Sequence, residues 1–278
     1  SWNTHVGSAE LSRFIVDLRS GRFTDGKPVQ HFVLLLQEVF RQRSKAQGMT
    51  PTNAETGANV RPTPTEGGRV DIVETAIQNR LGVLYVPSMR NSGPDDDVPA
   101  EDRGNAILST LPLASPVAVE LPLERQRRVA IGANVSGQST SGTYWTIQLV
   151  NVHLENRARW RKVFRTFGRA RLNQIAALLR AIPVETPSVL AGDFNTWFRG
   201  TREPTIHHAR EIFDRPAALP EQGTVKFGSI LPERITDYVL FRVPDNWQVA
   251  YRRADEPYGS DHYPLIGLLR IGKERRAE

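Results

Sequence analysis

The chain has 278 residues, of which 39% are hydrophobic and 24% charged, which is typical of a globular protein and excludes a disordered, collagen-like or coiled-coil chain. It has no cysteine, so disulfides, zinc–thiolate sites and cysteine nucleophiles are excluded, and a metal would need oxygen or imidazole ligands. The net charge is +6 and most of the 36 basic residues are arginine, which favours a polyanionic partner: nucleic acid, anionic lipid or a phosphate ester. A GC-rich genome is the alternative explanation for the arginine.

No apolar run approaches the roughly 18 residues that a membrane helix needs, and no signal peptide is evident. The opening Ser1-Trp2-Asn3 is typical of the end of a strand, and we expect a trimmed or processed N-terminus. The lack of cysteine is compatible with export to the extracellular space, but the sequence leaves the compartment open.

The first predicted element is a short amphipathic helix, because Leu11, Phe14, Ile15 and Leu18 follow the i, i+3, i+4, i+7 spacing. Residues 31–38 form an apolar run that predicts a buried strand ending at Glu38. The next predictions, in chain order, are a loop over 41–70, a helix over 71–81, a strand over 84–87 and a polar loop over 90–103.

The second half of the chain is predicted to be richer in strands than in helices. The predicted strands are 104–109, 128–135, 144–154, 188–195, 234–241 and 262–269, and the predicted helices are 157–181, with a break at Gly168, and 203–213. This order predicts an α/β or α+β fold with helices covering sheets. We expect one domain over residues 1–270 and a charged tail over 271–278.

Polar residues follow several of the predicted strands, and each one alone fits an ordinary turn. Asp193 and Asn195 are two residues apart, so in an extended segment they face the same side. Taken together, these carboxylate, amide and imidazole groups are typical of a site for a hard cation such as Mg²⁺ with acid–base groups beside it.

An ordered set of short motifs resembles the endonuclease/exonuclease/phosphatase superfamily of DNase I-like proteins. The motifs are Trp2-Asn3, Leu36-Gln37-Glu38-Val39, Gly104-Asn105-Ala106-Ile107-Leu108-Ser109, Asn151-Val152-His153-Leu154, Gly192-Asp193-Phe194-Asn195, Asp237-Tyr238 and Ser260-Asp261-His262-Tyr263-Pro264. The resemblance implies a four-layered α/β sandwich, in which two mainly antiparallel sheets pack face to face with helices outside. It also implies metal-dependent hydrolysis of a phosphate ester.

The resemblance implies specific roles on the metal side of such a site. Glu38 matches the metal-binding glutamate, Asn3 the asparagine that contacts metal or phosphate, and Asp261 a second carboxylate beside the metal. Asp193 matches the aspartate that orients or deprotonates the attacking water, and Asn195 the asparagine that supports it and stabilises phosphoryl charge. The expected metal is Mg²⁺, with Mn²⁺ or Ca²⁺ as alternatives.

The remaining roles concern the phosphate. His262 and His153 match the histidines that contact phosphate oxygens, and Asp237 matches the carboxylate that holds His262. Arg128 is the candidate for a phosphate-contacting arginine, with Arg127 as its rival. The partner of His153 stays open among four residues: Glu74, Glu101, Asp102 and Tyr85.

Two segments bear on the choice of substrate. Residues 157–171 place seven basic residues around Trp160, Phe164 and Phe167, which fits either a nucleic-acid or membrane surface or an ordinary helix with an aromatic core stripe. Trp197 and Phe198 follow Asn195 and fit either base or lipid contact or simple packing.

The leading hypothesis is a Mg²⁺-dependent phosphodiesterase that acts on nucleic acid by attack of water activated by Asp193. The alternatives are a phospholipid or sphingomyelin phosphodiesterase, a phosphomonoesterase such as an inositol phosphatase, and, least favoured because the matched residues are all present, an inactive binding module. An anionic lipid or membrane surface therefore stays a possible partner, and no protein partner is inferred. The segment Glu233–Tyr238 departs from the pattern of AP endonucleases, so no subgroup is assigned.

Overall fold

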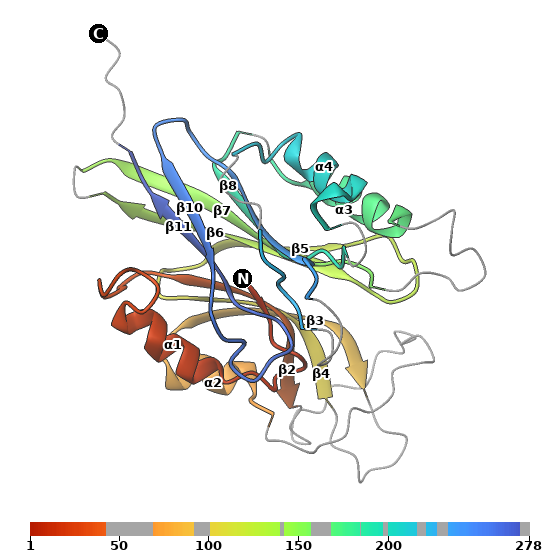
Figure 1. The fold of residues 1–278 in the computed structure, drawn as a ribbon, viewed down its shortest axis with the longest axis horizontal. Helices are drawn as coiled ribbons and strands as arrows, with labels where there is room; N and C mark the ends of the chain where they lie inside the picture. Colours follow the sequence, from red (N-terminus) through yellow and green to blue (C-terminus); the bar gives the residue numbers. More distant parts are fainter. Residues whose placement is uncertain are drawn as a thin grey trace.

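A computed structural model describes residues 1–42, 69–91, 101–139, 142–156, 168–183, 185–196, 200–215, 221–226 and 233–272. Two larger sheets lie face to face (Figure 1). Helices α1 (Leu11–Ser20) and α2 (Ile72–Gln78) cover the outer side of one sheet, and α3 (Arg169–Ala181) and α4 (Pro204–Arg210) cover the outer side of the other. This is the four-layered α/β sandwich that the family resemblance implies.

The first sheet has the strand order β1-β2-β4-β3. Its strands and covering helices are β1 Trp2–Asn3, α1 Leu11–Ser20, β2 Val33–Gln42, α2 Ile72–Gln78, β3 Gly82–Asn91 and β4 Glu101–Ser109. Strand β1 runs parallel to β2, and the other pairs are antiparallel. Leu34 and Leu36 face the helices while Leu35 faces the second sheet, which explains the unbroken apolar run in β2.

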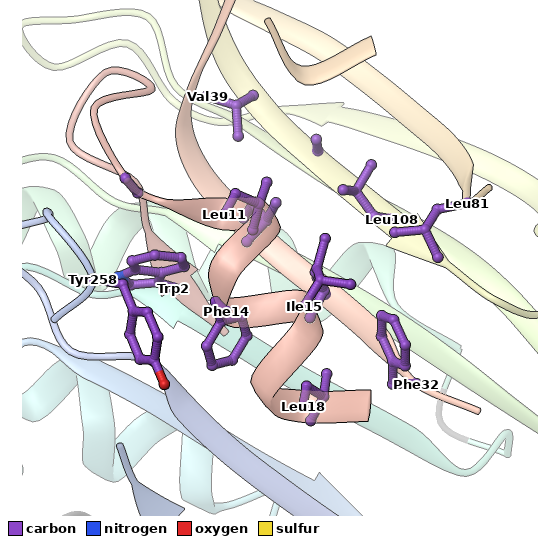
Figure 2. Packing of buried hydrophobic residues seen from close by; sticks show 14 of the residues in the cluster. Trp2, Leu11, Phe14, Ile15, Leu18, Phe32, Val39, Leu81, Leu108 and Tyr258 are labelled. Atoms are coloured by element: carbon purple, nitrogen blue, oxygen red, sulfur yellow. The ribbon is translucent and has the colours of Figure 1, made fainter. Parts of the chain in front are cut away.

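Helix α1 buries the four residues whose spacing predicts it. Leu11, Phe14, Ile15 and Leu18 pack onto the first sheet with Trp2 and Tyr258, as Figure 2 shows. The helix ends at Gly21, whose left-handed backbone (φ 88°) lets its N–H return to the carbonyls of Asp17 and Leu18. This cluster fixes the N-terminal strand beside residues from the far end of the chain.

The second sheet has the order β5-β6-β7-β8-β9, and β10 and β11 form a separate antiparallel pair. The elements of this half are β5 Ala114–Glu120, β6 Val129–Gln138, β7 Tyr144–His153, α3 Arg169–Ala181, β8 Ser188–Asp193, the 3₁₀ turn η2 Gly200–Arg202, α4 Pro204–Arg210, β9 Asp237–Arg242, β10 Gln248–Arg253 and β11 Leu265–Arg270. Strands β7 and β8 are parallel, and the connection between them contains α3.

Buried amides join the two sheets where apolar side chains would otherwise fill the gap. Asn151 of β7 donates to the carbonyls of Leu36 (2.8 Å) and Ala106 (2.9 Å) in the first sheet, and it accepts from Gln37 (2.7 Å). Asn105 of β4 donates to the carbonyl of Val129 (2.7 Å). These bonds fix the offset of one sheet relative to the other.

Several predicted boundaries were wrong. The polar loop predicted over 90–103 is shorter, because β3 continues to Asn91 and β4 begins at Glu101. Helices α2 and α4 are shorter than predicted, and the strands predicted from 234 and 262 begin at Asp237 and Leu265. Strands β5 and β10 were not predicted. Among the described residues, no helix is both long and apolar enough to cross a membrane.

Candidate active site

A β-bulge brings Glu38 to the site. Leu36 pairs with Ala106 and Val39 with Gly104, so Gln37 and Glu38 together oppose one residue of β4, Asn105. Glu38 has a left-handed backbone (φ 51°), which is unfavourable for a residue with a side chain. The strained conformation lets consecutive side chains serve two purposes: Gln37 bonds to the second sheet, and the Glu38 carboxylate comes within 3.7 Å of Nε2 of His153.

Strand register places three of the predicted site residues in a row. His153 is paired with Asp193 across β7 and β8, and Asp193 is paired with Asp237 across β8 and β9. Nε2 of His153 lies 3.6 Å from Oδ2 of Asp193. The sheet itself therefore sets the separation of these groups.

Asp193 is 2% exposed and is held from two sides. Asn3 donates from Nδ2 to Oδ2 (3.0 Å), and the backbone N–H of Asn195 donates to Oδ1 (2.8 Å). Burial, reinforced by the negative charge of Asp237, raises the pKa of Asp193 to about 7. The carboxyl group is thus poised to exchange a proton near neutral pH.

Asn195 is also buried and has a left-handed backbone (φ 54°). Its side-chain amide donates to the carbonyl of Leu154 (3.0 Å), which ties the loop after β8 to the end of β7. Its backbone N–H is the group that donates to Asp193.

Asp237 and His262 form a buried pair. Nδ1 of His262 lies 2.9 Å from Oδ2 of Asp237, and the hydroxyls of Thr224 (2.7 Å) and Thr236 (2.8 Å) donate to the same oxygen. Burial alone would lower the pKa of His262, but the charge and hydrogen bond of Asp237 and the charge of Asp193 raise it to about 10. Nε2 of His262 then faces Asp193 at 3.9 Å as part of an imidazolium at neutral pH.

His153 has the opposite electrostatic character. It is 4% exposed, and burial, followed by the positive charges of Arg128 and His262, lowers its pKa well below 6.5. Its Nε2 atom lies within 4 Å of the carboxylates of Glu38 and Asp193. Of the four partners considered from the sequence, Glu74 is exposed on α2, where it bonds to Gln78.

Arg128, rather than Arg127, lies beside His153. Arg128 is 2% exposed and donates to Oε1 of Gln126 (3.0 Å), whereas Arg127 is exposed and is engaged with Glu120 and the carbonyl of Pro87. The loop before Arg128 is fixed by Glu155, a buried carboxylate that accepts from the backbone N–H groups of Arg125 and Gln126.

His5, which sequence reasoning missed, joins the cluster through Asp261. Nδ1 of His5 lies 2.9 Å from Oδ1 of Asp261, and this hydrogen bond raises the pKa of His5 above its usual value. Burial alone would raise the pKa of Asp261, but His5 and His262 lower it. The only sequence signal for His5 was its place two residues after Asn3.

One side of the cluster is open. The side chains of Glu38, Asp261 and His5 are 25%, 40% and 53% exposed, whereas those of Asp193, Asp237 and His262 are at most 6% exposed. Substrate and ions would therefore reach the buried groups past Glu38 and Asp261. Among the described residues, Asp193, Asp237 and His262 place ligand-type atoms within 4.8 Å of one another. A protonated His262 has no lone pair for a cation, whereas the carboxylate oxygens on the open side are ligands that suit a hard divalent ion.

The basic stretch is only partly described. Arg157 to Phe167 and Trp197 to Arg199 lie outside the described residues. Gly168 (φ 85°) precedes the first residue of α3, and the predicted helical half before it falls outside the described residues. Arg171 is not a surface charge: it is 6% exposed and forms an ion pair with the buried Glu203, with Nε to Oε1 at 2.6 Å.

Solved structures share this fold at low sequence identity. An endonuclease/exonuclease/phosphatase from Beutenbergia cavernae DSM 12333 is 19% identical, with a TM-score of 0.62, over 98% of this chain and 70% of that one. The human Nocturnin catalytic domain is 16% identical, with a TM-score of 0.56 and 97% and 92% coverage. An AP endonuclease from Archaeoglobus fulgidus is 14% identical, with a TM-score of 0.52 and 96% and 97% coverage.

The comparison with curated proteins gave no match. The model of the Endonuclease/Exonuclease/phosphatase family matches residues 1–262, a span that includes each residue of the cluster described above. Members of this family hydrolyse phosphoric esters and generally depend on a divalent metal. The chain belongs to the endonuclease/exonuclease/phosphatase family.

Proposed function

We propose that this protein is a Mg²⁺-dependent phosphodiesterase that cleaves nucleic acid, with Asp193 activating the attacking water. The observation that supports this most directly is the pairing of a buried carboxyl group of pKa about 7 with an imidazolium of pKa about 10, 3.9 Å away. Between these pH values one group accepts a proton while the other donates a hydrogen bond.

Each residue has a defined task in the proposed reaction. Asp193 takes a proton from water, while Asn3 and the backbone of Asn195 hold the carboxylate in place. His262, fixed by Asp237, donates to a non-bridging phosphate oxygen as negative charge develops there.

Arg128 and His153 are the other two groups that we propose to meet the phosphate. Burial, reinforced by the charge of Arg128, keeps His153 neutral, so the imidazole offers one N–H donor rather than a second positive charge. Arg128 itself supplies the charge that would meet the phosphate.

Glu38 and Asp261, with Asn3, are the groups we propose to hold the metal. They are oxygen donors on the open side of the cluster, which suits Mg²⁺, an ion that keeps several water ligands. When bound, Mg²⁺ would polarise a phosphoryl oxygen and offset its growing charge.

Nucleic acid is proposed as the substrate on the basis of the net charge of +6 and of the AP endonuclease among the structural neighbours. A lipid phosphodiester and a phosphomonoester remain the competing substrates for the same chemistry.

The test is hydrolysis of a substrate panel in Mg²⁺, with EDTA as the control. The panel contains plasmid DNA, single-stranded RNA, sphingomyelin vesicles, inositol phosphates and bis(4-nitrophenyl) phosphate. We expect EDTA-sensitive cleavage of nucleic acid, and a loss of at least about 100-fold in kcat for Asp193→Asn, because a positioned base contributes roughly 10²–10⁴-fold. Asp25→Asn, an exposed carboxyl remote from the cluster, is the matched control.

Each alternative outcome is informative. Near-full activity of Asp193→Asn would contradict the assignment of the base. If the protein cleaved only the vesicles or only the inositol phosphates, the proposal of nucleic acid as the substrate would be wrong, and the cleaved compound would take its place. Hydrolysis that EDTA does not reduce would remove the metal from the proposal.

A further inference from the structure

The turn after β1 has an unusual backbone. Three consecutive residues, His5 (φ 47°), Val6 (φ 56°) and Gly7 (φ 73°), lie in the left-handed region, which L-residues with side chains rarely occupy and a β-branched residue almost never does. Gly7 is required there for a second reason, because a Cβ atom would come within 2.6 Å of Cβ of Phe40.

The surrounding structure holds this turn in place from several sides. The hydroxyl of Thr4 is within 3.0 Å of the carbonyl of Gln37 and 3.1 Å of that of Glu38, so the turn is tied to the bulge of β2. The backbone N–H of His5 donates to Oδ1 of Asn3 (3.1 Å), which directs the other end of the Asn3 amide to Asp193. Backbone strain that is held by several surrounding hydrogen bonds is common at functional sites, so the His5 side chain is a candidate for a functional role.

The His5 side chain lies on the open side of the cluster. Asp261 engages Nδ1 at 2.9 Å, and the imidazole is 53% exposed. Among the described parts of the chain, no residue hydrogen-bonds Nε2 of His5. Because Asp261 holds Nδ1, the ring has a fixed orientation, and Nε2 is available to a ligand that enters past Glu38 and Asp261.

We propose that His5 is a substrate-contacting residue. Its Nε2 atom hydrogen-bonds an oxygen of the phosphate ester next to the scissile bond, while Asp261 sets the orientation of the ring. This inference rests on the proposed function, because it uses the same cleft and the same class of substrate. It differs from a purely structural role, in which the contact between His5 and Asp261 would only close the turn.

The substitution His5→Asn isolates the imidazole. Asparagine is among the residues that tolerate the left-handed region, so the backbone requirement is met while the ring is lost. His31→Asn is the matched control, since His31 is exposed and lies before the first residue of β2, outside the cluster. His5→Gln is the rescue variant, because its longer amide again reaches toward the substrate.

The measurement is KM and kcat, in Mg²⁺, for whichever panel substrate the wild type hydrolyses, together with Tm. We expect His5→Asn to raise KM about tenfold, as for loss of one substrate hydrogen bond, with kcat within about twofold and Tm unchanged. His5→Gln should recover most of the loss, and His31→Asn should match the wild type.

An unchanged KM in His5→Asn would overturn the inference, as would a lower Tm with KM intact, which is the result expected of a structural contact. If the wild type hydrolyses nothing, the proposed function fails by itself. Binding of a fluorescein-labelled 12-nucleotide DNA, followed by anisotropy, then decides the inference: weaker binding by His5→Asn than by His31→Asn supports it, and equal binding overturns it.

Discussion

At the scale of single residues, burial acts on several titratable groups, and their partners decide the outcome. Burial is the largest effect on Asp193 and His153: the pKa of Asp193 rises to about 7, and that of His153 falls well below 6.5. Burial alone would lower the pKa of His262, but the negative charges of Asp237 and Asp193 outweigh it and raise the pKa to about 10.

These shifts predict a bell-shaped pH profile. A base of pKa about 7 must lose its proton, so kcat/KM should rise as pH passes through about 7. A donor of pKa about 10 must keep its proton, so kcat/KM should fall as pH passes through about 10. Asp237→Asn should move the fall to lower pH, because it removes both the charge and the ionic hydrogen bond that raise the pKa of His262. A steady-state pH series from 5 to 11 measures both limbs, and an alkaline limb that stays in place would contradict the role of Asp237.

The same shift links His262 to stability, with a definite sign. A folded-state pKa above the unfolded value of about 6.5 stabilises the fold fully below pH 6.5, and this contribution is lost as pH rises through about 10.

Not every residue could be assigned from the sequence. Motif order was enough to select Asn3, Glu38 and Asp193 as neighbours. Asn3 and Asp193 end β1 and β8 and share a hydrogen bond, and the bulge inside β2 brings Glu38 to His153, beside Asp193. His5 could not be found in this way, since its position depends on a left-handed turn, and neither His5 nor Val6 is of a residue type that predicts such a turn. Arg171 was grouped with surface charges because its partner, Glu203, is 32 residues away in the chain.

At the scale of secondary structure, a glycine determines how closely β8 lies against β7 in the site. Gly192 has an extended backbone of positive φ (153°), and a Cβ atom there would come within 1.8 Å of the carbonyl oxygen of Val152. Only glycine lets β8 lie this close to β7, and this places Asp193 beside His153.

We therefore expect Gly192→Ala to destabilise the fold by about 3 kcal/mol, because the atoms it meets are backbone and cannot move aside alone. Gly82→Ala is the control, since its nearest neighbour would be the carbonyl oxygen of Ser109 at an ordinary 3.6 Å. Urea unfolding gives both values. Equal free energies of unfolding for the two variants would show that β7 and β8 can separate enough to accommodate a methyl group at residue 192, which would contradict the prediction.

The two strands missing from the predictions share a physical cause. Strand β5 is largely exposed at the sheet edge and contains Pro116, which normally argues against a strand and here lies in a bulge between Ala114 and Val117. Strand β10 is only partly buried, in a two-stranded pair, and carries adjacent arginines. Neither offers the apolar alternation on which strand prediction depends.

At the scale of the whole molecule, the site spans the interface between the sheets. Glu38 comes from the first sheet, and His153, Asp193 and Asp237 come from the second. The layer order followed from family resemblance, but the offset between the sheets could not, because it depends on the hydrogen bonds of Asn151.

We expect Asn151→Leu to destabilise the protein by about 3 kcal/mol, since two buried carbonyls, those of Leu36 and Ala106, lose their donor. Activity should fall further than the unfolded fraction explains, because Glu38 would no longer be held opposite His153. Asn173→Leu, on the exposed side of α3, is the control. Chemical denaturation with activity measured on the folded fraction tests both parts, and full activity per folded molecule would contradict the second.

The contact between the two ends of the described chain bears on biosynthesis. Trp2 donates from its indole to the carbonyl of His262 (2.8 Å), and Ser260 donates to the carbonyl of Asn3 (2.8 Å). Within this chain, the ribosome makes Asn3 and Glu38 long before Ser260 and His262, so a nascent chain holds one part of the cluster without the other. The proposed active site can therefore assemble only after translation has passed residue 262.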